Sequence, residues 1–147
     1  MLLTWIANQP AVWKKLDGII VPEDFSNELT REIMNQFTRQ VQNTGTINPA
    51  EMIDAFPDVE QHSKVSAILN EEVRFEGSEE EDPGLKREFA NKAITETVRR
   101  IKEESLNRQM KEVTESQMES GEKSRRFLEL MEQQQKLKNL YITLDNG

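Results

Sequence analysis

The chain has 147 residues, enough for one domain with a buried core or for a compact domain with an appendage. Charged residues make up 31% of it and hydrophobic residues 35%, and its few glycines and prolines favour helix over sheet. The absence of cysteine excludes a disulfide framework, a thiol nucleophile and a cysteine zinc cluster, and no apolar run approaches the roughly 20 residues that span a bilayer.

The net charge of −8 is unevenly distributed along the chain. Residues 1–83 hold 6 Lys or Arg against 16 Asp or Glu, a net charge of −10, whereas residues 84–147 hold 13 against 11, a net charge of +2. Because nucleic-acid binding needs clustered cations, we expect no direct nucleic-acid binding. The first residues lack the basic and long apolar regions of a signal peptide, so we expect a cytoplasmic location and no membrane partner.

The first 75 residues predict five short-to-medium helices, beginning with two short ones. Pro10 separates these two, because proline is tolerated in the first turn of a helix. Their large side chains include Trp5 and Trp13, which we expect in the core rather than stacked on a ligand. The other apolar residues of the pair are Leu2, Leu3, Ile6 and Leu16.

A longer helix should follow the cap residue Ser26 and end at Gly45, since serine favours the start of a helix and glycine its end. Two short helices are then predicted from Asn48-Pro49 and from Pro57. No stretch alternates with the period of two that a strand requires. The longer helix carries apolar residues at steps of four: Leu29, Ile33, Phe37 and Val41.

The segment "RFEGSEEEDPG" is the clearest break in the helical pattern. It contains the acidic run Glu79, Glu80, Glu81 and Asp82. Four adjacent carboxylates are a conceivable metal site, but the spacing is not that of an EF-hand. A solvated acidic loop ahead of the next helix is the better interpretation, so we predict no metal and no cofactor.

A long helix is predicted next, because no glycine or proline lies between Gly84 and Gly121. Up to about 36 residues are available, which is about 54 Å of helix. One apolar face comprises Leu85, Phe89, Ala93, Ile94, Val98 and Ile101, and a second comprises Leu106, Met110, Val113 and Gln117. The five-residue step between the two faces rotates them by about 140°. The two halves should therefore pack against different elements.

The second half should pack against a final helix that follows a turn at Gly121, forming a helical hairpin. Counting outward from the turn pairs Val113 with Phe127, Met110 with Leu130 or Met131, and Leu106 with Leu137. A two-helix seam has little core, so we expect the hairpin to move relative to the body near residues 102–106.

The predicted fold is therefore all-α. A compact helical bundle of five to six helices, residues 1–101, precedes a C-terminal helical hairpin, residues 102–147, which continues the long helix that begins near residue 84. The end of the chain carries the apolar residues Leu140, Tyr141, Ile142 and Leu144. Such a cluster either marks a partner site or folds back on the body, and both interpretations stay open.

Catalytic constellations are absent from the sequence. His62 is the only histidine, and a small helical hydrolase using His62 and Asp58 is the enzyme alternative. The simpler interpretation of His62 is a surface residue on a polar helix face. The residues themselves therefore predict a non-catalytic helical interaction module.

A resemblance extends this interpretation. The first 55 residues resemble the helical domain shared by two bacterial replication proteins, the C-terminal domain of the DnaG-type primase and the N-terminal domain of the replicative helicase. The segment "ILNEE", the long helix and the terminal hairpin resemble the primase version. The matching residues of the first part are Leu2, Leu3, Pro10, Leu16, Ile20, Pro22, Glu23, Asp24, Phe25, Arg31, Ile33, Gly45, Ile47 and Ile53.

The resemblance implies that the domain binds the N-terminal region of the hexameric, DnaB-type replicative helicase and stimulates the helicase. It also implies that the hairpin is the principal docking element. The terminal residues Leu140, Tyr141, Ile142 and Leu144 are the candidate contacts. The parent primase would be a DNA-directed RNA polymerase that makes primers, whereas this domain would have no activity of its own. The alternatives are an N-terminal-type domain of a replicative helicase and an unrelated helical adaptor or scaffold.

Overall fold

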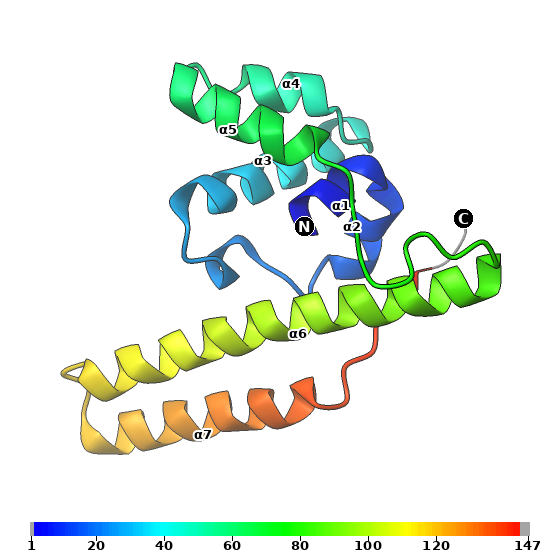
Figure 1. The fold of residues 1–147 in the computed structure, drawn as a ribbon. Helices are drawn as coiled ribbons and strands as arrows, with labels where there is room; N and C mark the ends of the chain where they lie inside the picture. The colour runs from blue at the N-terminus through cyan, green and yellow to red at the C-terminus, as the bar shows by residue number, and fades with distance from the viewer. Residues whose placement is uncertain (1, 145–147) are drawn as a thin grey trace.

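The computed structural model describes residues 2–144, which form seven α-helices and one short 3₁₀ helix, with no strand in that range (Figure 1). This confirms the prediction of an all-α fold with a long helix followed by a further helix. The elements are α1 (Leu2–Asn8), α2 (Pro10–Leu16), η1 (Pro22–Asp24), α3 (Glu28–Thr44), α4 (Pro49–Asp54), α5 (Val59–Asn70), α6 (Pro83–Glu115) and α7 (Ser120–Leu137).

The body of the molecule is the bundle of α1 to α5 (Figure 1). Its core contains Trp5 and Trp13, as expected, and the Trp13 ring lies 6.2 Å from that of Phe37. Burying one such side chain contributes about 1.5–3 kcal/mol. The hydroxyl of Thr4 donates a hydrogen bond of 2.7 Å to the carbonyl of Ile68, which ties α1 to α5. Apolar burial and a few polar ties therefore fix the bundle.

The helix boundaries follow from capping residues, with two corrections to the sequence analysis. The cap of α3 is Asn27 and not Ser26, because the Asn27 side chain accepts a hydrogen bond from the backbone N–H of Thr30. Asp58 caps α5 in the same way, so this helix begins at Val59, two residues after the predicted start at Pro57. Gly45 ends α3 with a φ of 75°, a left-handed conformation that glycine adopts at low cost.

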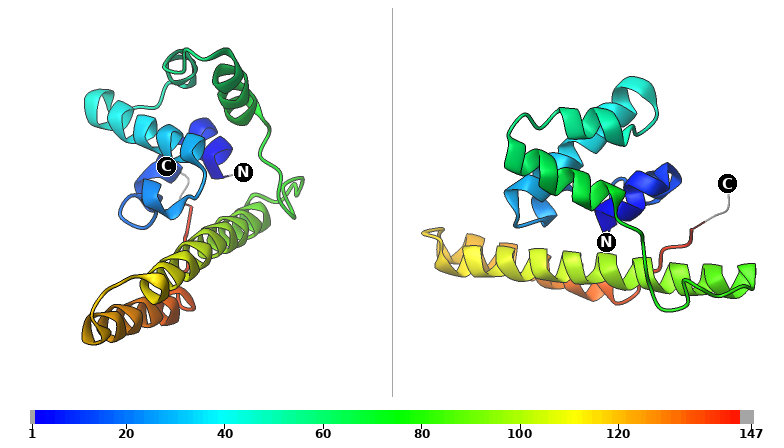
Figure 2. Two further views of the ribbon diagram at one scale, coloured as in Figure 1. Left: turned by 90° about the vertical axis from the view of Figure 1, so that its left-hand side faces the viewer. Right: turned by 45° about the horizontal axis from the view of Figure 1, so that its top comes forward.

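Helices α6 and α7 form an antiparallel pair beside the body. The 33 residues of α6 span about 50 Å, and α7 lies along its second half, on the side away from α3 to α5 (Figures 1 and 2). None of the helices within residues 2–144 has the length and apolarity needed to cross a lipid bilayer.

The turn between α6 and α7 is not at Gly121. The chain turns at residues 116–119, and Gly121 is the second residue of α7. Ser116 ends α6, since its hydroxyl donates to the carbonyl of Val113 (2.7 Å) and its backbone is extended. A serine cap replaces the predicted glycine turn, and Gln117 lies in the turn instead of on the second face of α6.

The two faces of α6 contact different elements, as their phase predicts. Ile94 and Val98 are buried in the core of the body, whereas Leu106 and Val113 belong to a second, smaller cluster with α7. Leu85, assigned to the first face, is 48% exposed near the start of the helix. Along α6, packing against the body changes to packing against α7 close to residue 102.

Candidate protein-interaction surface

The hairpin has its own small core. Leu106 and Val113 of α6 pack with Leu130 and Leu137 of α7, and Met110 and Leu140 cover this cluster in part. Polar side chains bridge the two helices at the edges of the cluster. The side-chain amide of Gln134 donates a hydrogen bond to the side-chain oxygen of Asn107 (2.9 Å). The guanidinium of Arg126 donates one to the side-chain oxygen of Gln109 (3.1 Å). Five of the seven residues predicted for the seam are therefore in it.

Phe127 and Met131 are the two residues that correct the predicted seam. They are 37% and 43% exposed and lie outside the cluster. The buried side of α7 is centred on Leu130 and Leu137, which are seven residues apart. At about 100° per residue, Phe127 lies about 60° and Met131 about 100° away from Leu130 around the helix.

The displaced residues form an exposed apolar surface on α7. Leu128, 65% exposed, lies on the same side of the helix as Phe127 and Met131. We call these three residues the outer stripe. Single exposed apolar side chains are ordinary on a protein surface, but three large ones within five residues of one helix are typical of a partner site.

The end of the chain folds back on the body. Residues 138–144, which we call the strap, leave α7 and pass α6 toward the bundle (Figure 1). Arg99 of α6 donates to the carbonyls of Lys138 and Leu140. The hydroxyl of Thr95 accepts from the backbone N–H of Ile142 at 2.9 Å. The strap is therefore bound to α6 through its main chain.

The strap also corrects the idea of an exposed terminal cluster. Ile142 is only 4% exposed and belongs to the core of the body, and Leu140 and Leu144 are partly buried against it. The backbone N–H of Leu144 donates to the side-chain oxygen of Asn91 at 2.6 Å. Tyr141, 62% exposed, is the member of the predicted set whose side chain remains available to a partner. Of the two interpretations left open, folding back on the body describes the other three.

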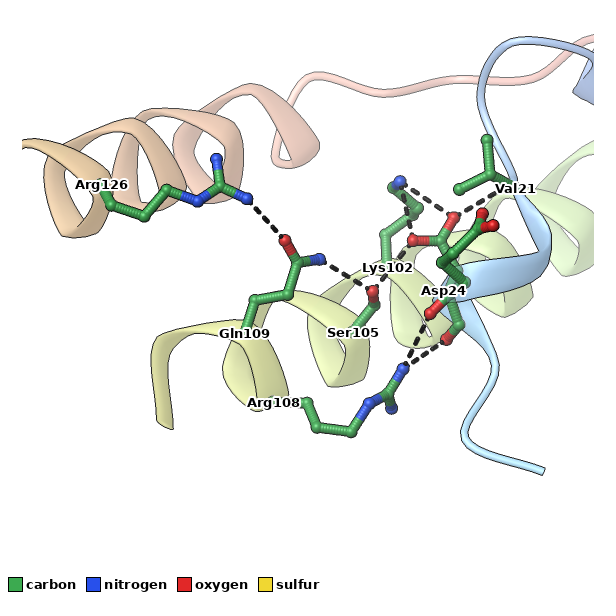
Figure 3. Close-up of polar contacts among 8 residues, drawn as sticks. Val21, Asp24, Lys102, Ser105, Arg108, Gln109 and Arg126 are labelled. Carbon is green, nitrogen blue, oxygen red and sulfur yellow. Dashed lines mark hydrogen bonds and ion pairs between the residues drawn. The ribbon is translucent and has the colours of Figure 1, made fainter. Parts of the chain in front are cut away.

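A buried carboxylate joins the body to α6. Asp24 of η1 is 4% exposed, and its carboxylate accepts hydrogen bonds from the backbone N–H of Val21 (2.9 Å) and the hydroxyl of Ser105 (2.9 Å). The Lys102 ammonium lies 3.0 and 3.1 Å from its two oxygens (Figure 3). We call Asp24 with these partners the junction.

Two arginines extend the junction along the hairpin. Arg108 donates to the main-chain carbonyls of Glu23 (3.3 Å) and Asp24 (3.0 Å). The side-chain amide of Gln109 donates to the hydroxyl of Ser105 (3.2 Å) and accepts from Arg126 of α7 (Figure 3). A continuous path of hydrogen bonds therefore runs from η1 through α6 to α7.

The junction lies in the segment where the hairpin was expected to move. Residues 102–106 were expected to be the place where the hairpin moves, but Lys102 and Ser105 are the two α6 residues that bind the buried Asp24 carboxylate. Separating them from Asp24 would leave charged and polar groups without partners, which is costly in a buried setting. These contacts therefore oppose a movement of this part of α6 relative to the body.

The residues considered for catalysis and metal binding are helix caps or exposed surface residues. The carboxylate of Asp58 caps α5 by accepting from the N–H groups of Glu60 and Gln61, and His62 is exposed on the same helix. Within the described residues, no group of three or more histidine, aspartate or glutamate side chains is arranged to hold a metal ion. Asp82 of the acidic run caps α6.

Comparison with known proteins gives one family. The sequence model of a family described as a domain of unknown function, DUF8430, matches residues 12–147. The match begins in α2 and extends over the rest of the bundle, the hairpin and the strap. No curated protein and no solved structure matches the chain.

Proposed function

We propose that this domain, which belongs to the DUF8430 family, binds the N-terminal region of a hexameric bacterial replicative helicase. In this role it is the non-catalytic docking domain of a DnaG-type primase and holds primer synthesis at the moving replication fork. The sequence resemblance to that primase domain, which runs from Leu2 to the terminal hairpin, supports the proposal.

The observation that carries the proposal is the outer stripe of α7. An antiparallel hairpin that keeps its own small core and turns three large apolar residues outward has the form of a docking element. An apolar helix face commonly binds in a groove between helices of its partner. We include Tyr141 in the proposed surface, because an exposed aromatic side chain is a frequent source of binding energy.

Charge supports a protein partner rather than a nucleic acid. The net charge of −10 over residues 1–83 repels phosphates, and the cations of the junction are paired with Asp24 or with main-chain carbonyls. Single-stranded nucleic acid usually binds to aromatic side chains along a cationic groove. The proposed contribution of the domain to primer synthesis is therefore the attachment to the helicase.

A titration of the domain with the replicative helicase from the same source tests the proposal. We expect a complex at micromolar concentrations, since a Kd of 1 μM corresponds to about −8 kcal/mol. A helicase that lacks its N-terminal region serves as the control and should not bind. Absence of a complex with the intact helicase at tens of micromolar would contradict the proposal and favour an adaptor with another partner.

A further inference from the structure

In the junction, both oxygens of the Asp24 carboxylate accept hydrogen bonds. The two oxygens of Asp24 receive donors from its own segment, Val21, and from α6, Lys102 and Ser105. The Asp24 side chain is 3% exposed and that of Lys102 is 20% exposed, so the ion pair is largely removed from water. A buried pair of this kind contributes little to stability relative to apolar packing, but it fixes one relative arrangement of its partners.

The position of the junction is informative. Ile101, the last residue of the first apolar face, packs on the body, and Leu106, the first residue of the second face, packs on α7. Lys102 and Ser105 lie between them, where α6 leaves the core of the body. Beyond this point the polar contacts with η1 supplement the apolar packing, and the path through Gln109 reaches Arg126 of α7.

We propose that Asp24 is the positioning residue of the hairpin: its carboxylate sets the orientation of the second half of α6, and with it of α7, relative to the body. Helix α6 is continuous over 33 residues, and the contacts of Asp24 with Lys102 and Ser105 fix how it lies against η1 beyond Ile101. The Gln109 amide then transmits the constraint to α7.

The positioning role of Asp24 also has a consequence for the affinity of the domain for its partner, and this consequence rests on the proposed function. A partner that contacts the outer stripe and the body at the same time binds two surfaces whose relative orientation is fixed before binding. Loss of the junction leaves each part intact but requires the complex to order the hairpin, which lowers the affinity. The first effect of losing Asp24 is therefore on geometry, and the effect on binding follows from it.

Distances between spin labels test the positioning role directly. The chain contains no cysteine, so cysteines introduced at His62 on α5 and Gln135 on α7, both exposed, are the labelling sites. In Asp24→Asn we expect the distribution of distances between these sites to become at least about twice as wide. A second label pair within the body, at Asn43 and His62, should not change. Asp54→Asn, which removes an exposed carboxylate of α4, is the matched control and should resemble the original protein.

A distribution as narrow in Asp24→Asn as in the original protein would overturn the assignment. If Asp24→Asn does not fold, Lys102→Met and Gln109→Ala, which keep the carboxylate, should each widen the distribution, and unchanged widths in both would overturn it. Helicase titration should show about 5–10-fold weaker binding for Asp24→Asn, with an intact outer stripe. Equal affinity would overturn the docking consequence. Absence of binding by the original protein would contradict the proposed function, while the distances still decide the role of Asp24.

Discussion

Ile142→Ala should lower the free energy of unfolding by about 2–4 kcal/mol, although the residue lies near the end of the sequence. Its side chain is buried in the core of the body, and its main chain is bound to Thr95 of α6. Shortening the side chain leaves a cavity and weakens the contact that holds the strap. The effect should therefore resemble that of a central core residue.

Urea denaturation followed by circular dichroism measures this change. Tyr141→Ala is the control, because the neighbouring side chain is largely exposed and its loss should change stability by less than about 0.5 kcal/mol. Equal stabilities for the two variants would show that the strap is not part of the core. The comparison also separates the two roles of the strap, since Ile142 stabilises the fold and Tyr141 is proposed to contact the partner.

Replacing the outer stripe with serine, in the triple variant Phe127→Ser, Leu128→Ser and Met131→Ser, should weaken helicase binding at least about 100-fold. Such a decrease corresponds to about 2.7 kcal/mol, which is modest for three large apolar side chains in the centre of an interface. The three residues contribute little to the hairpin core, which consists of Leu130 and Leu137 with their partners from α6. The helix should therefore remain folded.

Leu85→Ser is the matched control for the stripe variant. Leu85 is also an exposed leucine on a helix, but it lies at the end of α6 opposite the turn that leads into α7 (Figure 1). We expect its affinity for the helicase to stay within about two-fold of the original, within the small range of effects expected for a residue outside an interface. If the triple variant bound as tightly as Leu85→Ser, the docking surface would lie elsewhere.

The helical architecture could be predicted because its causes are local. Steps of three and four between apolar residues, a glycine or asparagine at a helix end and the proline after Asn48 are each sufficient to indicate a helix or its boundary. The five-residue step from Ile101 to Leu106 predicted that α6 contacts two different elements, and the two hydrophobic clusters agree with it. Periodicity thus describes which side of a helix is buried.

Periodicity does not identify the partner of a buried polar group. Asp24 is separated from Ser105 by 81 residues, and no local pattern connects them. One signal was present, because Lys102 and Ser105 occupy the interval where the apolar face of α6 changes phase. Polar residues in such an interval are candidates for binding a buried group of another segment. The strap was ambiguous for a related reason, since apolar residues alone do not distinguish a core contact from a partner contact.

The register of the hairpin was the least predictable feature. Both Gly121 and Ser116 are plausible turn residues, and moving the turn by a few positions changes which residues of α7 face α6. The choice depends on the hydroxyl of Ser116 at the end of α6 and on the bridges from Gln134 and Arg126. As a result, Phe127 and Met131 were assigned to the seam, and the outer stripe was not recognised from the sequence.

The measurement that tests the docking surface most directly is oxidative footprinting of the domain, free and bound to the helicase. Phe127 and Met131 are reactive side chains in the outer stripe, and Val59 and Leu85 are exposed references on α5 and on the opposite end of α6. We expect the helicase to protect Phe127 and Met131 from oxidation and to leave Val59 and Leu85 as reactive as in the free domain. Protection of Val59 and Leu85 with unchanged oxidation of Phe127 and Met131 would contradict docking through α7.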